Sequence, residues 1–154
     1  MHTALLTLLL AATPAHSAEV VVLGRVTEVT MLPEGHARCT PRCTADQICV
    51  SNSCGCGEAT IEVKDIVAGQ VKSSVVVVPY RLGEWCSADF PLGELVLVRM
   101  FDGESLWSPA EVMPSGEVLF EIEHFDFIAG VRASELPAAD GRASISALRK
   151  AAGL

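Results

Sequence analysis

The chain has 154 residues, and half of them are apolar, which is the composition of one globular domain rather than of a disordered chain. It carries 11 Lys and Arg against 19 Asp and Glu, for a net charge of −8. Without a cluster of basic residues, it lacks the positive surface that nucleic acids and anionic membranes attract. We therefore expect an acidic domain that binds no nucleic acid.

The first residues have the features of a secretory signal peptide. An apolar run at residues 4–12 precedes Pro14 and is too short to span a bilayer, which takes about 20 residues. Ala15 and Ser17 are small residues at the −3 and −1 positions of a cleavage site. We place cleavage after Ser17, so that residues 1–17 are the signal peptide. The mature chain would be secreted or periplasmic, with no membrane span.

The mature chain contains six cysteines, and an even number in an exported protein favours disulfides. Five are clustered and interleaved with Pro and Gly, which predicts a stapled loop. Zinc is the alternative, but the spacing lacks the paired C-x2-C of common structural sites, so we expect no metal. One clustered cysteine should pair with the distant sixth, and we choose Cys56, although fifteen pairings are open. The six are Cys39, Cys43, Cys49, Cys54, Cys56 and Cys86.

Short apolar or alternating runs separated by turn residues predict a mainly β domain. Gly24 would mark an irregularity in the first strand, and Asp102-Gly103 predicts a hairpin after the fourth. Pro109 and Pro114 would break the chain before the last strand. The expected strands are residues 20–30, 59–67, 71–80, 94–101 and 118–125.

A short C-terminal helix follows from the pattern of residues 144–152. Ser144 would cap it, Ile145 and Leu148 would share one side, and Gly153 would end it. The expected organisation is thus a signal peptide, a β domain and a tail with this helix. Their bounds are 1–17 for the signal peptide, 18–135 for the domain, 36–57 for its cysteine-rich insertion and 136–154 for the tail.

Several stretches carry a family resemblance, and in the last of them a Cys precedes a short loop, a Gly and a hydrophobic strand. They are residues 19–26, 59–63, 67–69, 75–79 and 86–98. In this order they resemble the superfamily of tissue inhibitors of metalloproteinases and netrin modules. The resemblance implies a five-stranded Greek-key barrel of the OB type. The clustered cysteines are similar to small EGF-like knots and would be inserted after the first strand.

What the resemblance implies for function is a binding scaffold. Inhibitors of that superfamily chelate a protease's zinc through an N-terminal cysteine, whereas this mature chain would begin near Ala18 and its Cys54-Gly55-Cys56 is internal. In OB-type barrels the loop after the first strand helps to form the binding face. We therefore expect partner contacts on the cysteine-rich loop and on the Gly83 to Asp89 loop. The chosen residues are Pro41, Arg42, Asp46, Gln47 and Trp85.

Catalytic chemistry is poorly represented in the sequence. Its mature part has two histidines, His36 and His124, and none of the common nucleophile, phosphate or metal motifs. On a strand, Glu121 and Glu123 would share one face, and a half-buried His124 the other, which favours a solvated surface over a site. Trp107, like Trp85, is expected in the core or covering a disulfide. We expect no enzyme and no cofactor.

The function that these features favour is a secreted, monomeric, non-enzymatic module that binds an extracellular or envelope protein. A protease is one class of partner. Two alternatives stay open. One is a structural protein of the cell envelope or extracellular matrix without a specific ligand, and the other is a small exported metal-dependent hydrolase centred on Glu123 and His124.

Overall fold

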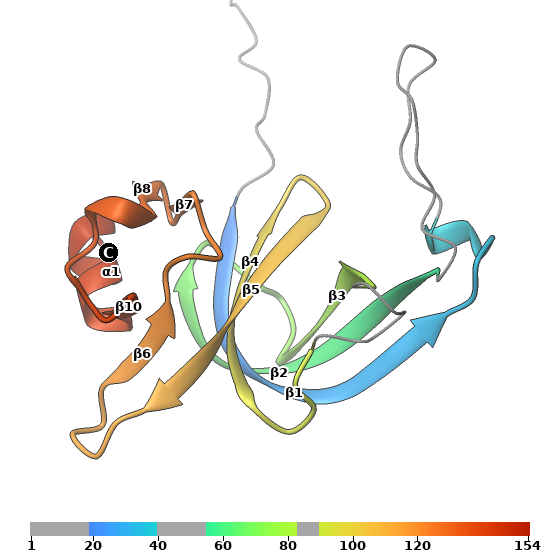
Figure 1. Cartoon of the computed structure of the whole chain (residues 1–154), viewed down its shortest axis with the longest axis horizontal. Coiled ribbons are helices and arrows are strands. Elements are labelled where there is room, and N and C mark those ends of the chain that lie inside the picture. The colour runs from blue at the N-terminus through green and yellow to red at the C-terminus, as the bar shows by residue number, and fades with distance from the viewer. Residues whose placement is uncertain (1–18, 40–54, 83–89) are drawn as a thin grey trace, which may run out of the picture.

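The computed structural model describes residues 19–39, 55–82 and 90–154 (Figure 1). The mainly β prediction is confirmed. The elements are β1 (Val20–Leu32), η1 (Ala37–Cys39), β2 (Cys56–Ala68), β3 (Val75–Arg81), β4 (Leu95–Phe101), β5 (Glu104–Val112), β6 (Val118–Glu121), β7 (Phe127–Ile128), β8 (Val131–Arg132), η3 (Ala133–Glu135), β9 (Ala138–Ala139), β10 (Arg142–Ser144) and α1 (Ile145–Ala152).

Eight strands form one sheet in the order β3-β2-β1-β4-β5-β6-β10-β9, and β7 pairs with β8 in a small hairpin of its own. The predicted hairpin at Asp102-Gly103 is confirmed, since it joins β4 to β5 with positive φ at both residues (51° and 76°). The predicted irregularity at Gly24 is confirmed as well, because the pairing of β1 with β2 changes register there. A Cβ at Gly24 would collide with the side chain of Ile61.

Pro109 does not break the chain, which corrects the prediction. It lies inside β5, where the strand changes partner. Val96 pairs with Pro109 at the end of the β4 ladder, and from Ala110 onward β5 pairs with β6. Buried Ser108 connects the strands at this point. Its hydroxyl accepts from the N–H of Glu121 at 2.9 Å and donates to the Pro109 carbonyl at 2.9 Å.

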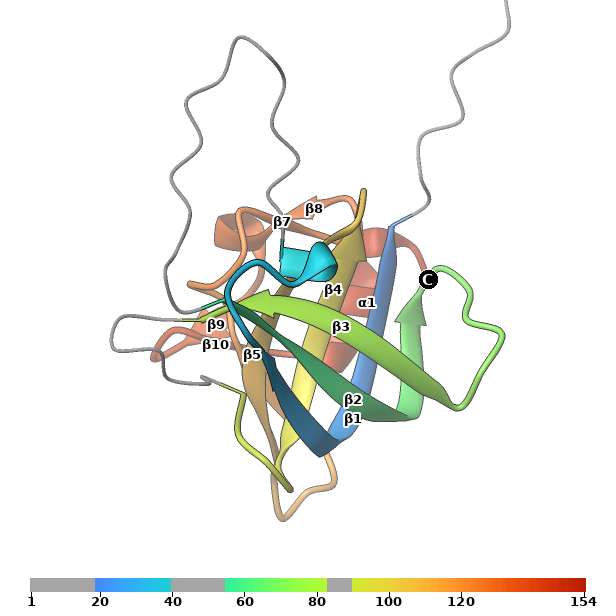
Figure 2. The ribbon, with the colours of Figure 1, turned by 90° about the vertical axis from the view of Figure 1, so that its right-hand side faces the viewer.

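The sheet curls, so that β3 crosses in front of β1 and β4 and comes against β5 (Figure 2). It is not closed there, because β3 and β5 are not paired. Pro79 contributes to this opening. Its carbonyl accepts from the Ser105 hydroxyl of β5, but at this position β3 has no N–H to offer to a ladder.

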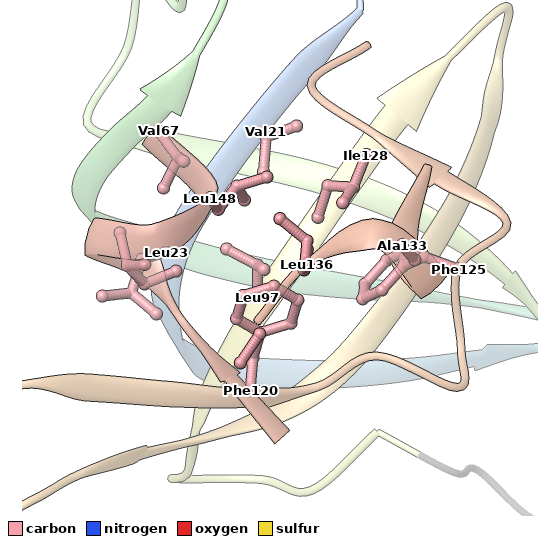
Figure 3. Close-up of a cluster of buried hydrophobic side chains, with 12 residues drawn as sticks. Val21, Leu23, Val67, Leu97, Phe120, Phe125, Ile128, Ala133, Leu136 and Leu148 are labelled. Atoms are coloured by element: carbon pink, nitrogen blue, oxygen red, sulfur yellow. The ribbon is translucent and has the colours of Figure 1, made fainter. Parts of the chain in front are cut away.

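The first face of the sheet is covered by the C-terminal segment (Figure 3). The predicted helix is confirmed as α1: the Ser144 hydroxyl accepts from the N–H of Ala147 at 3.1 Å, and Gly153 ends the helix with a φ of 71°. The segment predicted as a tail thus fills this core cluster. Its buried members are Val21, Leu23, Val67, Leu97, Phe120, Phe125, Ile128, Ala133, Leu136, Ala143, Ile145 and Leu148.

The second face is enclosed by the curl of the sheet itself. Successive side chains of a strand point to opposite faces of the sheet. In β1, Val21 and Leu23 therefore lie on the first face, and Val22 and Val26 lie on the second. Trp107 packs against this second cluster, as predicted for a core aromatic residue. Its buried members are Val22, Val26, Ala59, Ile61, Val78, Phe90, Val96 and Val98.

Candidate functional site

The first candidate site is carried by a projecting arm, which we define as residues 27–32 of β1 paired with residues 56–60 of β2. β4 accompanies β1 only as far as Arg25. The arm therefore extends beyond β4, while β3 accompanies β2 as far as Cys56, and it ends where the cysteine-rich loop begins (Figure 1).

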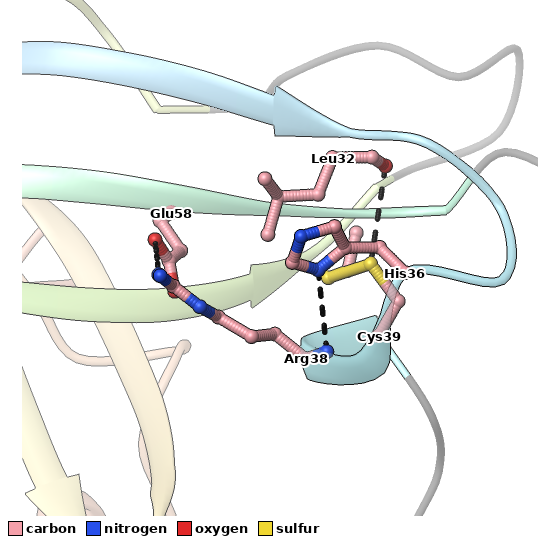
Figure 4. Close-up of a disulfide and its surroundings, with 6 residues drawn as sticks. Leu32, His36, Arg38, Cys39 and Glu58 are labelled. Atoms are coloured by element: carbon pink, nitrogen blue, oxygen red, sulfur yellow. Dashed lines mark hydrogen bonds and ion pairs between the residues drawn. A yellow bond between two sulfur atoms is a disulfide. The ribbon is translucent and has the colours of Figure 1, made fainter.

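A disulfide between Cys39 and Cys56 closes the end of the arm, with Cα atoms 5.2 Å apart (Figure 4). This corrects the choice of Cys86 as the partner of Cys56. Cys56 is the first residue of β2 and pairs with Leu32, while η1 folds the chain back so that the Cys39 sulfur lies 3.8 Å from the Leu32 carbonyl. Cys39 is thus held beside Cys56. Four predicted disulfide cysteines lie outside the described residues, namely Cys43, Cys49, Cys54 and Cys86.

An ion pair fixes η1 to the arm (Figure 4). Arg38 Nη1 lies 2.7 and 2.5 Å from the two carboxylate oxygens of Glu58. The hydrogen bond to Glu58, and next the charge of Glu58, raise the pKa of Arg38 above its usual range. The N–H of Arg38 also donates to Nδ1 of His36 at 3.3 Å. The two ends of the loop are therefore attached to the sheet by a covalent bond and by polar contacts.

The contact residues predicted from the sequence are not among those that the structure describes. Pro41, Arg42, Asp46, Gln47 and Trp85 all fall outside the described residues, as does the Gly83 to Asp89 loop. Their role in partner binding stays a prediction.

A second cluster of polar side chains lies at the end of β6. The prediction of a strand through residue 125 is wrong, because β6 ends at Glu121 and a turn follows, in which the N–H of Phe125 donates to the Ile122 carbonyl at 3.1 Å. The turn brings Glu121, Glu123 and His124 together, with ligand atoms within 4.8 Å of one another.

His124 is also more exposed than predicted, since 42% of its side chain is accessible. Its Nε2 lies 3.1 Å from a carboxylate oxygen of Glu121 and 3.9 Å from one of Glu123. The imidazole stacks on Trp107 at 6.4 Å between ring centroids, and Trp107 stacks in turn on Phe90 at 4.6 Å. One imidazole and two carboxylates are donors that a divalent cation accepts.

Sequence reasoning missed two residues that hold these regions in place, Ser108 and Glu19. Ser108 fixes the backbone of Glu121 from β5. The Glu19 carboxylate accepts hydrogen bonds from Arg99 and from the N–H groups of Ala129 and Gly130. Ala129 and Gly130 lie more than a hundred residues further along the chain. No local pattern reports such contacts.

Comparison with protein-family models, with curated proteins and with solved structures gives no match for this chain. Within residues 19–39, 55–82 and 90–154, no helix is long and apolar enough to cross a membrane.

Proposed function

We propose that the chain is an exported, non-enzymatic module that binds another protein through the loop at the end of the arm. The observation that carries this proposal is the Cys39–Cys56 disulfide, which joins the two ends of that loop at the end of the arm, where β1 and β2 extend beyond β4. Binding costs less conformational entropy when the ends of a contact loop are fixed beforehand.

The export step of the proposal rests on the signal-peptide features of residues 1–17, and the disulfide is in keeping with an oxidising compartment. The finer fold in the proposal is a derivative of the OB-type barrel, with the loop as an insertion. The neighbours of β1 and the approach of β3 to β5 support it. The resemblance to tissue inhibitors of metalloproteinases and netrin modules remains part of the proposal.

The proposal is tested by replacing residues 41–53 with a Gly/Ser segment of equal length, leaving Cys39 and Cys56 in place. Purified mature protein and variant are cross-linked to the secreted and envelope proteins of the source cells. We expect one or a few proteins to be captured by the intact loop alone. A matched control, Arg132→Gln with Glu135→Gln, changes an exposed ion pair elsewhere and should capture them equally.

Equal capture by the loop variant would contradict the proposal. If both proteins instead remain in the insoluble cell-wall fraction, the structural alternative replaces it.

A second candidate function, a metal-dependent hydrolase, is favoured only by the cluster of Glu121, Glu123 and His124. It predicts that Zn²⁺ binds the mature protein in calorimetric titration and that His124→Ala abolishes both binding and any hydrolysis. Absence of Zn²⁺ binding removes this candidate.

A further inference from the structure

The arm has one edge without a neighbouring strand. The last bonds between β1 and the start of β4 involve Val26, whose N–H donates to the Glu94 carbonyl at 3.0 Å and whose carbonyl accepts from Gly93 at 2.9 Å. Past Val26, β1 continues to Leu32 beside β2 alone. We call the edge of residues 27–32 that lies opposite β2 the outer edge of the arm.

The hydrogen-bond pattern shows which way the backbone of β2 points. In an antiparallel ladder, alternate residues direct both N–H and C=O to the same neighbouring strand. The N–H of Val63 donates to the Ser74 carbonyl at 2.8 Å, in register with the β2–β3 pairs. Odd-numbered residues at this end of β2 therefore face β3, and even-numbered residues face β1.

The pairs across the arm then show which residues of β1 point their N–H and C=O groups toward β2. Thr30 pairs with Glu58 and Leu32 with Cys56, so these residues of β1 bond to β2. Val29 and Met31 alternate with them and point their N–H and C=O groups to the outer edge. No described residue hydrogen-bonds to these four groups. The Met31 side chain beside them is apolar and its residue is 54% exposed.

The free edge of β3, by contrast, is protected on either side of the exposed Val77. Of its outward-facing residues, Pro79 has no N–H, and the N–H of Val75 is taken by the Ser73 hydroxyl at 3.1 Å. Proline and local capping are common protections against unwanted strand pairing. Among the described residues, the outer edge of the arm has neither a proline nor a capped N–H at Val29 and Met31. The exposed part of this edge is therefore open to strand pairing.

The charge around the outer edge is negative. Glu28, Glu34 and Glu94 are exposed and form no ion pair with any described residue, whereas the nearby Arg25 donates to the Gly93 carbonyl. A second copy of this chain would bring the same carboxylates to the edge. A segment with basic side chains fits better.

We propose that the outer edge of the arm binds an extended, basic segment of the partner protein by strand addition. Main-chain bonds to Val29 and Met31 would hold the segment, and Lys or Arg side chains would lie near Glu28. This inference rests on the proposed protein-binding function. It specifies which kind of partner segment would bind at the base of this chain's contact loop.

The probe is a fluorescein-labelled, acetylated peptide of four Lys-Val repeats, titrated into the mature protein with fluorescence anisotropy as the readout. Met31→Pro removes one outward N–H and no bond to β2, and Met31→Ala is its matched control, since it shortens the side chain and keeps the N–H. A peptide N-methylated at alternate residues keeps the charge but loses the pairing edge. Amide hydrogen exchange at Val29 and Met31 provides a second measurement, which needs no variant.

We expect wild type and Met31→Ala to bind within about threefold of each other, and Met31→Pro or the N-methylated peptide to bind at least tenfold more weakly. Peptide should slow exchange at Val29 and Met31. The proposal is overturned if every combination of protein variant and peptide binds equally. It is also overturned if amide exchange at Val29 and Met31 is unchanged at millimolar peptide. Peptide-independent protection with dimer formation would overturn it in favour of a second copy. Loop-dependent capture of a partner is a separate measurement, so failure of one proposal is distinguishable from failure of the other.

Discussion

Glu19 connects three parts of the molecule through one carboxylate. It lies 2.5 Å from Nε of Arg99 in β4, and it accepts from the N–H groups of Ala129 and Gly130, in the turn between β7 and β8, at 3.1 Å each. The side chains of Glu19 and Arg99 are only 19% and 20% exposed. The start of β1 is thus fixed to the segment that covers the first core cluster.

Glu19→Ala is expected to lower the free energy of unfolding by about 1–3 kcal/mol, because it leaves Arg99 and the N–H of Ala129, both partly buried, without their partner, together with the exposed N–H of Gly130. Urea unfolding measures the loss. Glu135→Ala is the control, since its pair with Arg132, at 3.4 Å, is exposed, and it should cost less than about 0.5 kcal/mol. Equal losses would contradict the anchoring role.

Ser108→Ala is expected to destabilise the protein by about 1–3 kcal/mol, although it removes one atom, because the N–H of Glu121 and the carbonyl of Pro109 lose a buried partner. Thermal unfolding followed by circular dichroism measures this. Exposed Ser115→Ala should stay within about 0.5 kcal/mol of wild type. A Ser108 variant as stable as that control would show that the contact is dispensable.

At this scale the sequence did not predict that Glu121, Glu123 and His124 lie together. Alternation on an assumed strand put His124 on the face opposite the two carboxylates and favoured a solvated surface there. The turn after Glu121 contains no Gly or Pro that would have signalled it. Ser108 and Glu19 act on residues remote in sequence, so no single-chain pattern could find them.

The N-terminus of α1 depends on a small network of hydroxyls and one carboxylate. The Ser146 hydroxyl donates to Glu117 at 2.9 Å and lies 2.9 Å from the Ser144 hydroxyl. Hydrogen bonding from Ser144 and then from Ser146 lowers the pKa of Glu117 below its usual 4.5. Ionised Glu117 is therefore favoured in the folded state.

Because the pKa of Glu117 is lower in the folded state, its stabilising effect is complete above pH 4.5 and is lost as the pH falls through the folded-state pKa. We expect Glu117→Gln to lower Tm at neutral pH, with a difference from wild type that shrinks in acid. A carboxyl titration by NMR should place the Glu117 pKa below 4.5, and Ser146→Ala should move it upward. A pKa at or above 4.5 in wild type would refute the network.

Removing the disulfide should loosen the arm without unfolding the sheet. For a sequence separation of 17, the double variant Cys39→Ser/Cys56→Ser should lose about 3 kcal/mol on the chain-entropy estimate. We expect faster amide exchange in residues 28–32 and 56–60, with exchange in β4 and β5 altered only by the global loss. Equal acceleration throughout the sheet would show that the bridge stabilises the whole fold instead.

Most long elements were predictable and the shortest were not, and the exception is β5, whose nine residues include Pro109 and were not predicted as a strand. The strands through β4 are long apolar or alternating runs, which the sequence shows directly. The helix α1 has a capping residue at each end, which marks its bounds in the sequence. Strands β7, β8, β9 and β10 have two or three residues each, too few to show a period. The pairing of Cys56 depended on where η1 turns the chain, which spacing alone does not determine.

At the scale of the whole molecule, the sheet is longer and more open than the five-stranded barrel that was expected. β6, β10 and β9 continue it beyond β5, and β3 and β5 form no ladder. The C-terminal extension of the sheet had no counterpart in the resemblance. The sequence therefore predicted the class of fold and the position of the loop, but not the closure.

Pro79→Val should promote self-association, because it adds an outward-facing N–H to a strand edge whose exposed Val77 would then be flanked by donors. Sedimentation over a range of concentrations measures this, with the wild-type protein and exposed Pro114→Val as controls. A Pro79 variant that stays monomeric would mean that contact with β5 already protects this edge.

The two core clusters are complete at different stages of synthesis. The second needs no residue beyond Trp107, whereas the first lacks Phe120, Leu136 and Leu148 until the end of the chain has been made. A nascent chain therefore exposes Val21 and Leu23 to chaperones for most of its translation. Under the proposed export, such a delay would keep this first face unassembled during transfer through a narrow protein-conducting channel.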